Sequence, residues 1–219
     1  LLIAEDAPVP SAQNNSDYIK YLSDTIYQLT KNADYQTMIL FNSLVMIEQV
    51  YSQLRETDLF DQRDILAQGI TGNRDKILKQ FSSGKNSILL GASSFWEGID
   101  LPDSALELLI ITRLPFDSPD EIMNRAHNKL LQQQGKNPFY HSELPKATMR
   151  LRQGIGRLLR TEDDHGVAVV LDPRLQTRRY GKTILSSLPT DLPVSGKKTA
   201  ELISITQKFL QNGKEDKVN

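Results

Sequence analysis

The sequence contains no cysteine, which excludes disulfide bonds, thiolate metal ligands and cysteine nucleophiles within its 219 residues. It also lacks any apolar run near the roughly 20 residues that a membrane helix needs. The opening segment, Leu1–Asp6, has neither the basic region nor the length of a signal peptide. These absences favour a soluble protein of a reducing, cytoplasmic compartment with no membrane partner. Because the chain has no initiator Met, we expect it to be a piece of a longer protein.

Several catalytic signatures are missing as well. No Gly-x-x-x-x-Gly-Lys-Ser/Thr loop is present to cradle phosphates, and no Gly-x-Gly-x-x-Gly follows an apolar run. Gly181–Thr183 has no upstream glycine or strand, so we interpret it as helix surface. The histidines, His127, His141 and His165, do not have metal-ligand spacing, and no metal site is predicted.

The overall charge does not indicate a class of partner, because the formal net charge is −1. A domain-wide basic field would have indicated nucleic-acid binding, so any such contact must be local. Arginines gather in two places that could make such local contacts. The alternative interpretation of these runs is a solvated face of the protein. The two groups are Arg150, Arg152, Arg157 and Arg160, followed by Arg174, Arg178 and Arg179.

Apolar runs separated by helical patterns predict an α/β fold. The expected strands are Met38–Phe41, Asp64–Gln68, Ser87–Gly91, Leu106–Thr112 and Gly166–Leu171. Continuous apolar runs suit strands that are covered on both faces, and alternation with helices implies parallel pairing. We therefore predict three layers, with a central, mostly parallel sheet between helices. In such sheets ligands bind at the carboxyl ends of the strands.

Helix signals lie between these runs. The expected helices extend from the Asn42–Ser43 cap to about Leu54, over Asn73–Phe81, from Pro119 to Gln134, from Pro145 to Arg160 and over Lys197–Gln211. We expect three regions: a lead-in with a helix at 1–37, the domain itself at 38–189 with an insertion at about 117–144, and a C-terminal helix and tail at 190–219.

The strongest motif is Gln153–Arg160, which reads Gln-x-x-Gly-Arg-x-x-Arg. On a continuous helix Gln153, Arg157 and Arg160 would share an arc of roughly 60°, opposite an apolar stripe. Guanidinium groups suit phosphate oxygens and neutralise the charge that develops in phosphoryl transfer. The glycines at 154 and 156 each cost about 1 kcal/mol in a helix, which suggests close approach by another surface. The alternative is an exposed basic helix end.

Two further segments end strands with small polar residues. Ile88–Pro102 is an apolar run followed by Ser93, Ser94 and then Trp-Glu-Gly-Ile-Asp, a pattern in which backbone amides and hydroxyls can meet a phosphate. Its alternative is a tight connector with Trp96 as a core residue. Met38–Ser43 ends a strand on a helix cap and is a weaker signal, because most α/β proteins have such turns.

Taken in order, these segments resemble the C-terminal RecA-like domain of superfamily 2 helicases, in the DinG branch related to XPD. Phe41–Ser43 resembles motif IV, Gly91–Pro102 resembles motif V and Gln153–Arg160 resembles motif VI. Thr112–Phe116 is similar to the segment that follows motif V. The resemblance covers about 38–189, and motifs V and VI are the specific ones.

The resemblance implies a role for each matching residue. Gln153, Arg157 and Arg160 would face the γ-phosphate of ATP, with Arg160 as the arginine finger. Glu97, Gly98 and Asp100 would couple the nucleotide to the nucleic-acid track. The residues that would hold phosphates of a single strand are Asn42, Ser43, Ser93 and Ser94, with Arg113 as a weaker candidate.

This resemblance predicts the C-terminal motor half of an ATP-dependent DNA helicase or translocase, inactive as a hydrolase alone. ATP with Mg²⁺ would be held mainly by the first RecA-like domain of the same protein, and single-stranded DNA would be the other partner. An iron–sulfur cluster, where relatives carry one, would lie outside this stretch, and a subgroup fuses a 3′-5′ exonuclease instead. No oligomer is required. The alternatives are a degenerate nucleic-acid-binding module without ATPase activity and a Rossmann-type small-molecule transferase.

Overall fold

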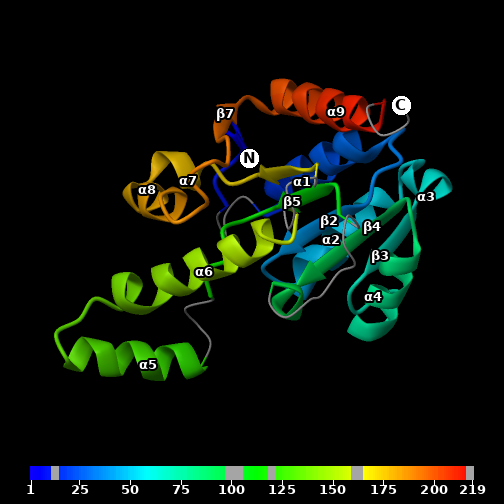
Figure 1. Cartoon of the computed structure of the whole chain (residues 1–219). Coiled ribbons are helices and arrows are strands. Elements are labelled where there is room, and N and C mark those ends of the chain that lie inside the picture. Colours follow the sequence, from blue (N-terminus) through cyan, green and yellow to red (C-terminus); the bar gives the residue numbers. More distant parts are fainter. Residues whose placement is uncertain (11–14, 97–105, 118–121, 159–164, 216–219) are drawn as a thin grey trace.

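A computed structural model describes residues 1–10, 15–96, 106–117, 122–158 and 165–215. Within these residues, seven strands form one sheet in the order β3-β4-β2-β5-β6-β1-β7, and every neighbouring pair is parallel (Figure 1). The strands are β1 (Leu2–Ala4), β2 (Thr37–Phe41), β3 (Asp64–Ala67), β4 (Ser87–Ala92), β5 (Leu108–Ile111), β6 (Val167–Val170) and β7 (Ser195–Lys197).

Helices cover both faces of the sheet. One face packs against α1 (Asn15–Thr30), α2 (Leu44–Leu54), α3 (Leu59–Gln62) and α9 (Thr199–Glu215). The other packs against α4 (Arg74–Ser83), α6 (Leu144–Ile155), α7 (Arg174–Thr177) and α8 (Arg179–Leu185). The predicted three-layer arrangement with a parallel sheet is therefore confirmed. Among the described helices, none is long and apolar enough to span a membrane.

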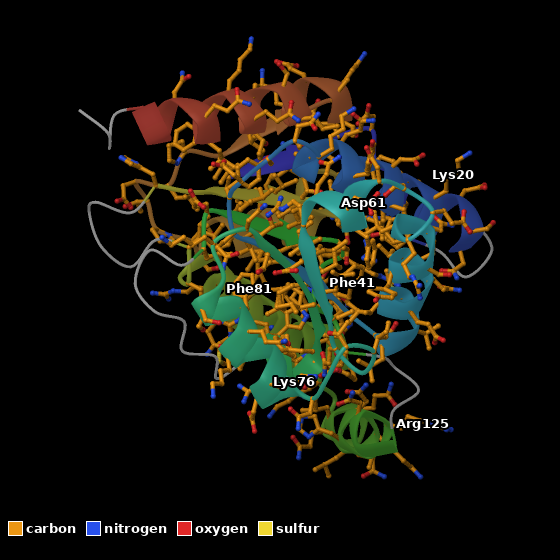
Figure 2. The ribbon with its side chains drawn as sticks, turned by 90° about the vertical axis from the view of Figure 1, so that its right-hand side faces the viewer. Lys20, Phe41, Asp61, Lys76, Phe81 and Arg125 are labelled. Carbon is orange, nitrogen blue, oxygen red and sulfur yellow. The ribbon has the colours of Figure 1, made fainter. Side chains whose placement is uncertain are left out.

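Alternation along the strands divides the core into these two halves. In β2, Ile39 and Phe41 belong to the cluster under α1 and α2, whereas Met38 and Leu40 belong to the cluster under α4 and α6. Figure 2 shows Phe41 and Phe81 inside the molecule, and both side chains are fully buried. Both faces of the strands are buried, which is why their sequences are apolar without alternation.

Two strands were not predicted. β1 lies inside the sheet between β6 and β7, and β7 forms one edge. They come from the segments that the sequence analysis set apart from the core, 1–37 and 190–219. Each is three residues long, too short to give a periodic signal, and β7 reads Ser-Gly-Lys. Asp6 then accepts hydrogen bonds from the Thr199 N–H (2.8 Å) and hydroxyl (2.6 Å), which fixes the start of α9.

The helix predicted from Pro145 through Arg160 is shorter than expected. α6 ends at Ile155, and the following bonds, Arg157 N–H to the Gly154 carbonyl and Leu158 N–H to the Ile155 carbonyl, span three residues. Such tightening is usual at a helix end, and the two glycines have low helix propensity. The continuous helix expected through Arg160 therefore ends earlier, at Ile155. Arg160 lies outside the described residues, so the common face expected for Gln153, Arg157 and Arg160 stays a prediction.

The insertion contains α5 (Ile122–Gln133), a π-helical turn, η2 (Phe139–Glu143), and the start of α6. α5 ends at Gln133, and Gly135, predicted to close this helix, has a φ of 71° in the left-handed region that glycine tolerates. The expected start of this helix, Pro119, lies outside the described residues. Figure 1 shows α5 beyond α6, on the side away from the sheet.

Candidate functional site

The carboxyl ends of the central strands surround a cleft of about 320 Å³. Residues that follow β2, β4 and β5 line it, together with one arginine from α6. They are Asn42, Ser93, Ser94, Trp96, Pro115, Phe116, Asp117 and Arg150. The cleft thus brings together three of the predicted phosphate-binding residues, Asn42, Ser93 and Ser94, from segments about 50 residues apart in the sequence.

At the end of β2, Asn42 joins two strands. Its Nδ2 donates to the carbonyl oxygens of Leu114 (2.9 Å) and Phe116 (3.3 Å), both of which follow β5. Its Oδ1 is buried without a hydrogen-bond partner. The neighbouring Ser43 caps α2, because its hydroxyl accepts from the Met46 N–H at 3.3 Å. Both amide protons of Asn42 are used within the fold, so this side chain positions the cleft wall and has no spare donor for a ligand.

At the end of β4 the chain turns sharply into a 3₁₀ turn, η1 (Ser93–Phe95). Ser93 has a φ of 45°, which is uncommon for a residue with a side chain. The turn folds the buried Phe95 ring back over Gly91, where an added Cβ would lie 2.5 Å from Phe95 Cγ. Glycine is therefore required at 91. The side chains of Ser93 and Ser94 remain exposed at the cleft, and the Ser94 hydroxyl accepts only a long bond from Gln68 Nε2 (3.5 Å).

Trp96 fills the space behind this turn. It is 3% exposed, and its Nε1 donates to the Phe41 carbonyl at 2.8 Å. Gly154 of α6 packs against this ring and against Leu40. A Cβ atom added at Gly154 would lie 3.7 Å from Trp96 Cζ3 and 3.6 Å from Leu40 Cδ1. The surface that closely approaches Gly154 thus belongs to this domain itself. The burial of Trp96 supports its interpretation as a core residue.

Arg157 connects α6 to the end of β4. Its Nη1 donates to the Phe95 carbonyl (2.5 Å) and its Nη2 to the Trp96 carbonyl (2.6 Å). The guanidinium is half-buried beside the segment that follows β4, and these two donors are used on backbone. Gln153 is exposed, whereas Leu151, Ile155 and Leu158 are buried against the sheet.

Four predicted residues cannot be assigned a geometry. Glu97, Gly98, Asp100 and Arg160 lie outside the described residues. Their roles remain predictions from the sequence.

Arg113 lies apart from the cleft. It follows β5 on the side of β6, near Tyr18 and Arg174, and it is not among the residues that line the cleft. Burial lowers the pKa of its guanidinium, and the nearby Arg174 lowers it further. The separation has a simple cause, because the cleft is built over the ends of β2 and β4, on the other side of β5.

A buried ion pair stands beside Arg113, and the sequence analysis missed it. Asp172, which is fully buried, accepts from Arg174 Nε (2.9 Å) and Nη2 (2.6 Å) and from the Leu114 N–H (2.9 Å). Burial alone would lower the pKa of Arg174, but its hydrogen bonds and charge interaction with Asp172 outweigh this and raise it. The pair holds the segment after β5 to the end of β6. Its only signal in the sequence is the position of Asp172 directly after an apolar run.

A second unpredicted pair closes the cleft at its outer end. Asp117 is 15% exposed and bonds Arg150, while Lys146 lies 3.8 Å away. Arg150 lies on α6, seven residues before Arg157, which follows the end of that helix. The available clue was its place in the same group of arginines as Arg157. The cleft therefore offers hydroxyl groups and a guanidinium, the donors that phosphate oxygens accept.

Metal binding has no support in the described part of the chain, where no group of three His, Cys, Asp or Glu side chains lies within metal-binding distance. The three histidines are exposed, and Lys182 and Thr183 lie on the surface of α8, as interpreted from the sequence.

Comparisons with known proteins identify the family of the chain. The family model described as "Helicase C-terminal domain" matches residues 26–191. The chain is 40% identical over 175 residues to the 3′-5′ exonuclease DinG of Bacillus subtilis, covering 78% of this chain and 19% of that protein. It is 36% identical over 199 residues to the ATP-dependent DNA helicase YoaA of Haemophilus influenzae, covering 91% and 30%. The chain thus spans less than a third of the length of these curated relatives.

Solved structures share the fold. The structure titled "XPD_Helicase" matches with a TM-score of 0.64 and 19% identity, covering 90% of this chain and 35% of that one. S. tokodaii Xpd4 matches with a TM-score of 0.62 and 16% identity, covering 90% and 38%. At these identities the likeness shows the fold alone.

Proposed function

The chain belongs to the helicase C-terminal domain family, and on that premise we propose that it is the second motor domain of an ATP-dependent DNA helicase of the DinG type. The observation that carries the proposal is the convergence of four separate segments at one cleft. The residues after β2, β4 and β5 and Arg150 of α6 meet at the carboxyl edge of a parallel sheet.

In this proposal the domain supplies half of a nucleotide site. The sequence has no phosphate-cradling loop, so ATP with Mg²⁺ would be bound by the first RecA-like domain of the same protein. This domain closes on that nucleotide and presents its guanidinium groups. Arginine fingers contribute about 10³–10⁵ in rate in enzymes of this general class.

The two arginines of the motif would divide the work. Arg157 is bonded to the carbonyls of Phe95 and Trp96, which supports a role in linking α6 to the segment after β4. Arg160 is therefore the proposed arginine finger, and Gln153, which is exposed, is a proposed additional contact to the nucleotide. Glu97, Gly98 and Asp100 directly follow the anchored Trp96, which favours their proposed role in coupling nucleotide to DNA.

Single-stranded DNA would bind at the cleft. Exposed hydroxyls at Ser93 and Ser94 are suited to phosphate oxygens, whereas Asn42 and Ser43 hold the neighbouring backbone in position. Contacts to phosphates alone would make binding tolerant of sequence and weaker at high salt. Arg113, on the far side of β5, is the least supported member of this proposed track.

The chain cannot contribute thiolate ligands to an iron–sulfur cluster, because it contains no cysteine. Such a cluster, or an exonuclease domain like that named for the Bacillus subtilis relative, would belong to other parts of the parent protein.

The division of the site between two domains gives a direct test. The isolated chain should show no ATP turnover and at most weak nucleotide binding, while the parent protein hydrolyses ATP when single-stranded DNA is added. Ser94→Ala in the parent should weaken single-strand binding, whereas Ser83→Ala, an exposed serine on α4, should not. Robust turnover by the isolated chain would contradict the half-site. Single-strand binding by the parent without any ATPase activity would favour the degenerate clamp.

A further inference from the structure

A helical arm projects from the body of the domain at the outer end of the cleft. We define the arm as residues 122–152, which include α5, η2 and most of α6. It contains six Lys or Arg residues and one acid, Glu143, so its net charge is +5, whereas the rest of the chain sums to −6. The balanced charge of the whole sequence therefore hides a strongly basic element. The cations are Arg125, Lys129, Lys136, Lys146, Arg150 and Arg152.

Four of these cations are available to a partner. Lys146 and Arg150 are engaged with Asp117 at the cleft. Arg125, Lys129, Lys136 and Arg152 are exposed, and their side chains make no hydrogen bond or ion pair within the described residues. An unpaired surface cation gives the fold itself no stabilising contact, but it can neutralise a phosphate.

The cations of α5 lie on its outer face. Asn124 and Leu131 are buried and define the inner face, while Arg125 and Lys129 are one turn apart and exposed. Figure 2 labels Arg125 beside α5, which lies at the bottom of that view. α5 has twelve residues and is therefore about 18 Å long, enough to follow several phosphates of a backbone.

The arm also exposes large apolar side chains. Leu130, Tyr140 and Met149 are 52%, 57% and 58% exposed, respectively. Apolar and aromatic groups among cations are typical of nucleic-acid-binding surfaces; because stacking needs unpaired bases, these groups do not by themselves favour a duplex, and the cations carry that choice.

The position of the arm argues for a second nucleic-acid segment. The cleft lies between the strand ends and the inner side of α6, where Arg150 lines it. α5 lies beyond α6, on the side away from the sheet (Figure 1). Arg125 and Lys129 are not among the residues that line the cleft, so a single strand held there leaves them available to another phosphate backbone.

We propose that the arm binds the backbone of double-stranded DNA adjacent to the single-strand cleft, through Arg125, Lys129 and their neighbouring cations. The proposal rests on the proposed function of the cleft, because it takes the single strand there as given. Duplex DNA fits this surface because Arg125 and Lys129, one turn apart on a helix, can each meet a phosphate of its regular backbone. Backbone contacts would require no particular sequence.

The test uses the parent protein and the double variant Arg125→Ala with Lys129→Ala. Two controls accompany it. The swap Arg125→Lys with Lys129→Arg keeps the charge of the arm. The pair Lys20→Ala with Lys208→Ala removes the same number of positive charges from exposed positions on α1 and α9. The probes are a forked DNA, a blunt duplex and a single strand of matched length. Binding is measured from 50 to 200 mM salt, a range that resolves the number of phosphate contacts.

Each lost phosphate contact should weaken binding by about eightfold at 0.1 M salt and reduce the salt slope by about 0.9. The alanine double variant should therefore bind the fork and the duplex up to about 60-fold more weakly, with a slope smaller by about 1.8. Single-strand affinity and single-strand-stimulated ATPase should stay unchanged, and both controls should behave as wild type.

Two results would overturn the proposal while leaving the proposed function intact. One is fork and duplex affinity equal to wild type in a protein with normal ATPase. The other is an equal loss for the single strand, which would assign the arm to the single-strand track. A wild-type parent without DNA-stimulated ATPase would instead refute the proposed function.

Discussion

Replacing Arg157 by alanine tests whether this residue anchors the segment that follows β4. Hydrogen bonds from a charged donor contribute about 1.5–3 kcal/mol each, and Arg157 donates two to backbone carbonyls. Because the guanidinium is half-buried, water can replace part of this hydrogen bonding in the variant. We therefore expect the free energy of unfolding to fall by about 2–3 kcal/mol. For a chain of this size that corresponds to a fall in Tm of about 4–12 °C. Arg157→Lys should lose about half as much, because one ammonium group cannot span both carbonyls.

The assay is thermal unfolding of the 219-residue chain, with Arg152→Ala as the matched control. Arg152 precedes Arg157 by five residues, is exposed and has no side-chain partner within the described residues. The control should change stability by no more than about 0.5 kcal/mol. If Arg157→Ala lowers Tm no more than Arg152→Ala does, the anchoring role is refuted, and with it the reason for distinguishing the two arginines of the motif.

Three other changes have expected outcomes. Gly91→Ala should lower the free energy of unfolding by about 1–3 kcal/mol, because its Cβ would overlap a buried phenylalanine ring. Gly154→Ala should leave stability unchanged or raise it slightly, and equal Tm values for the two variants would contradict this packing. Asp172→Asn should cost about 3 kcal/mol in urea unfolding, because it leaves a mostly buried arginine without its partner, and the exposed Asp75→Asn should cost almost nothing. Burial raises the pKa of Tyr18 above its ordinary value of 10, so the folded state holds this proton more tightly, and its stabilising contribution is complete below pH 10 and lost as the pH rises further. Tyr18→Phe should therefore flatten the alkaline loss of stability by about 1.4 kcal/mol per pH unit, and an unchanged slope would exclude this cause.

The sheet was largely predictable from the sequence because its central strands are buried on both faces. Strands such as β2 and β5 are continuous apolar runs, and the helices between them require parallel pairing. β1 and β7 escaped detection because three residues cannot show a period and because β7 is an edge strand with a polar sequence. Their positions in the sheet depend on long-range pairing that no local pattern encodes.

The candidate site was predictable as a set of segments, but less so as a set of contacts. The rule that ligands bind at carboxyl ends pointed to Asn42, Ser93 and Ser94, which line one cleft, although their binding of phosphate stays a prediction. Which donors are already used is a property of three-dimensional packing. Asn42 and Arg157 both spend donors on backbone carbonyls from distant segments, and no pattern in the sequence could show this.

The arm illustrates the same limit for charge. Its basic character was present in the sequence, but the acidic remainder of the chain cancels it in the total. Only the fold separates Arg125 and Lys129, which are exposed and unpaired in the described residues, from Arg150, which is paired at the cleft.

The central claim is that this domain completes a nucleotide site whose other half lies on a separate domain. The most direct measurement is DNA-stimulated ATP hydrolysis by the parent protein carrying Arg160→Ala, with far-ultraviolet circular dichroism to verify its fold. We expect a loss of about 10³-fold or more in ATPase activity with normal secondary structure. Wild-type hydrolysis by that folded variant would show that the motif does not act on ATP.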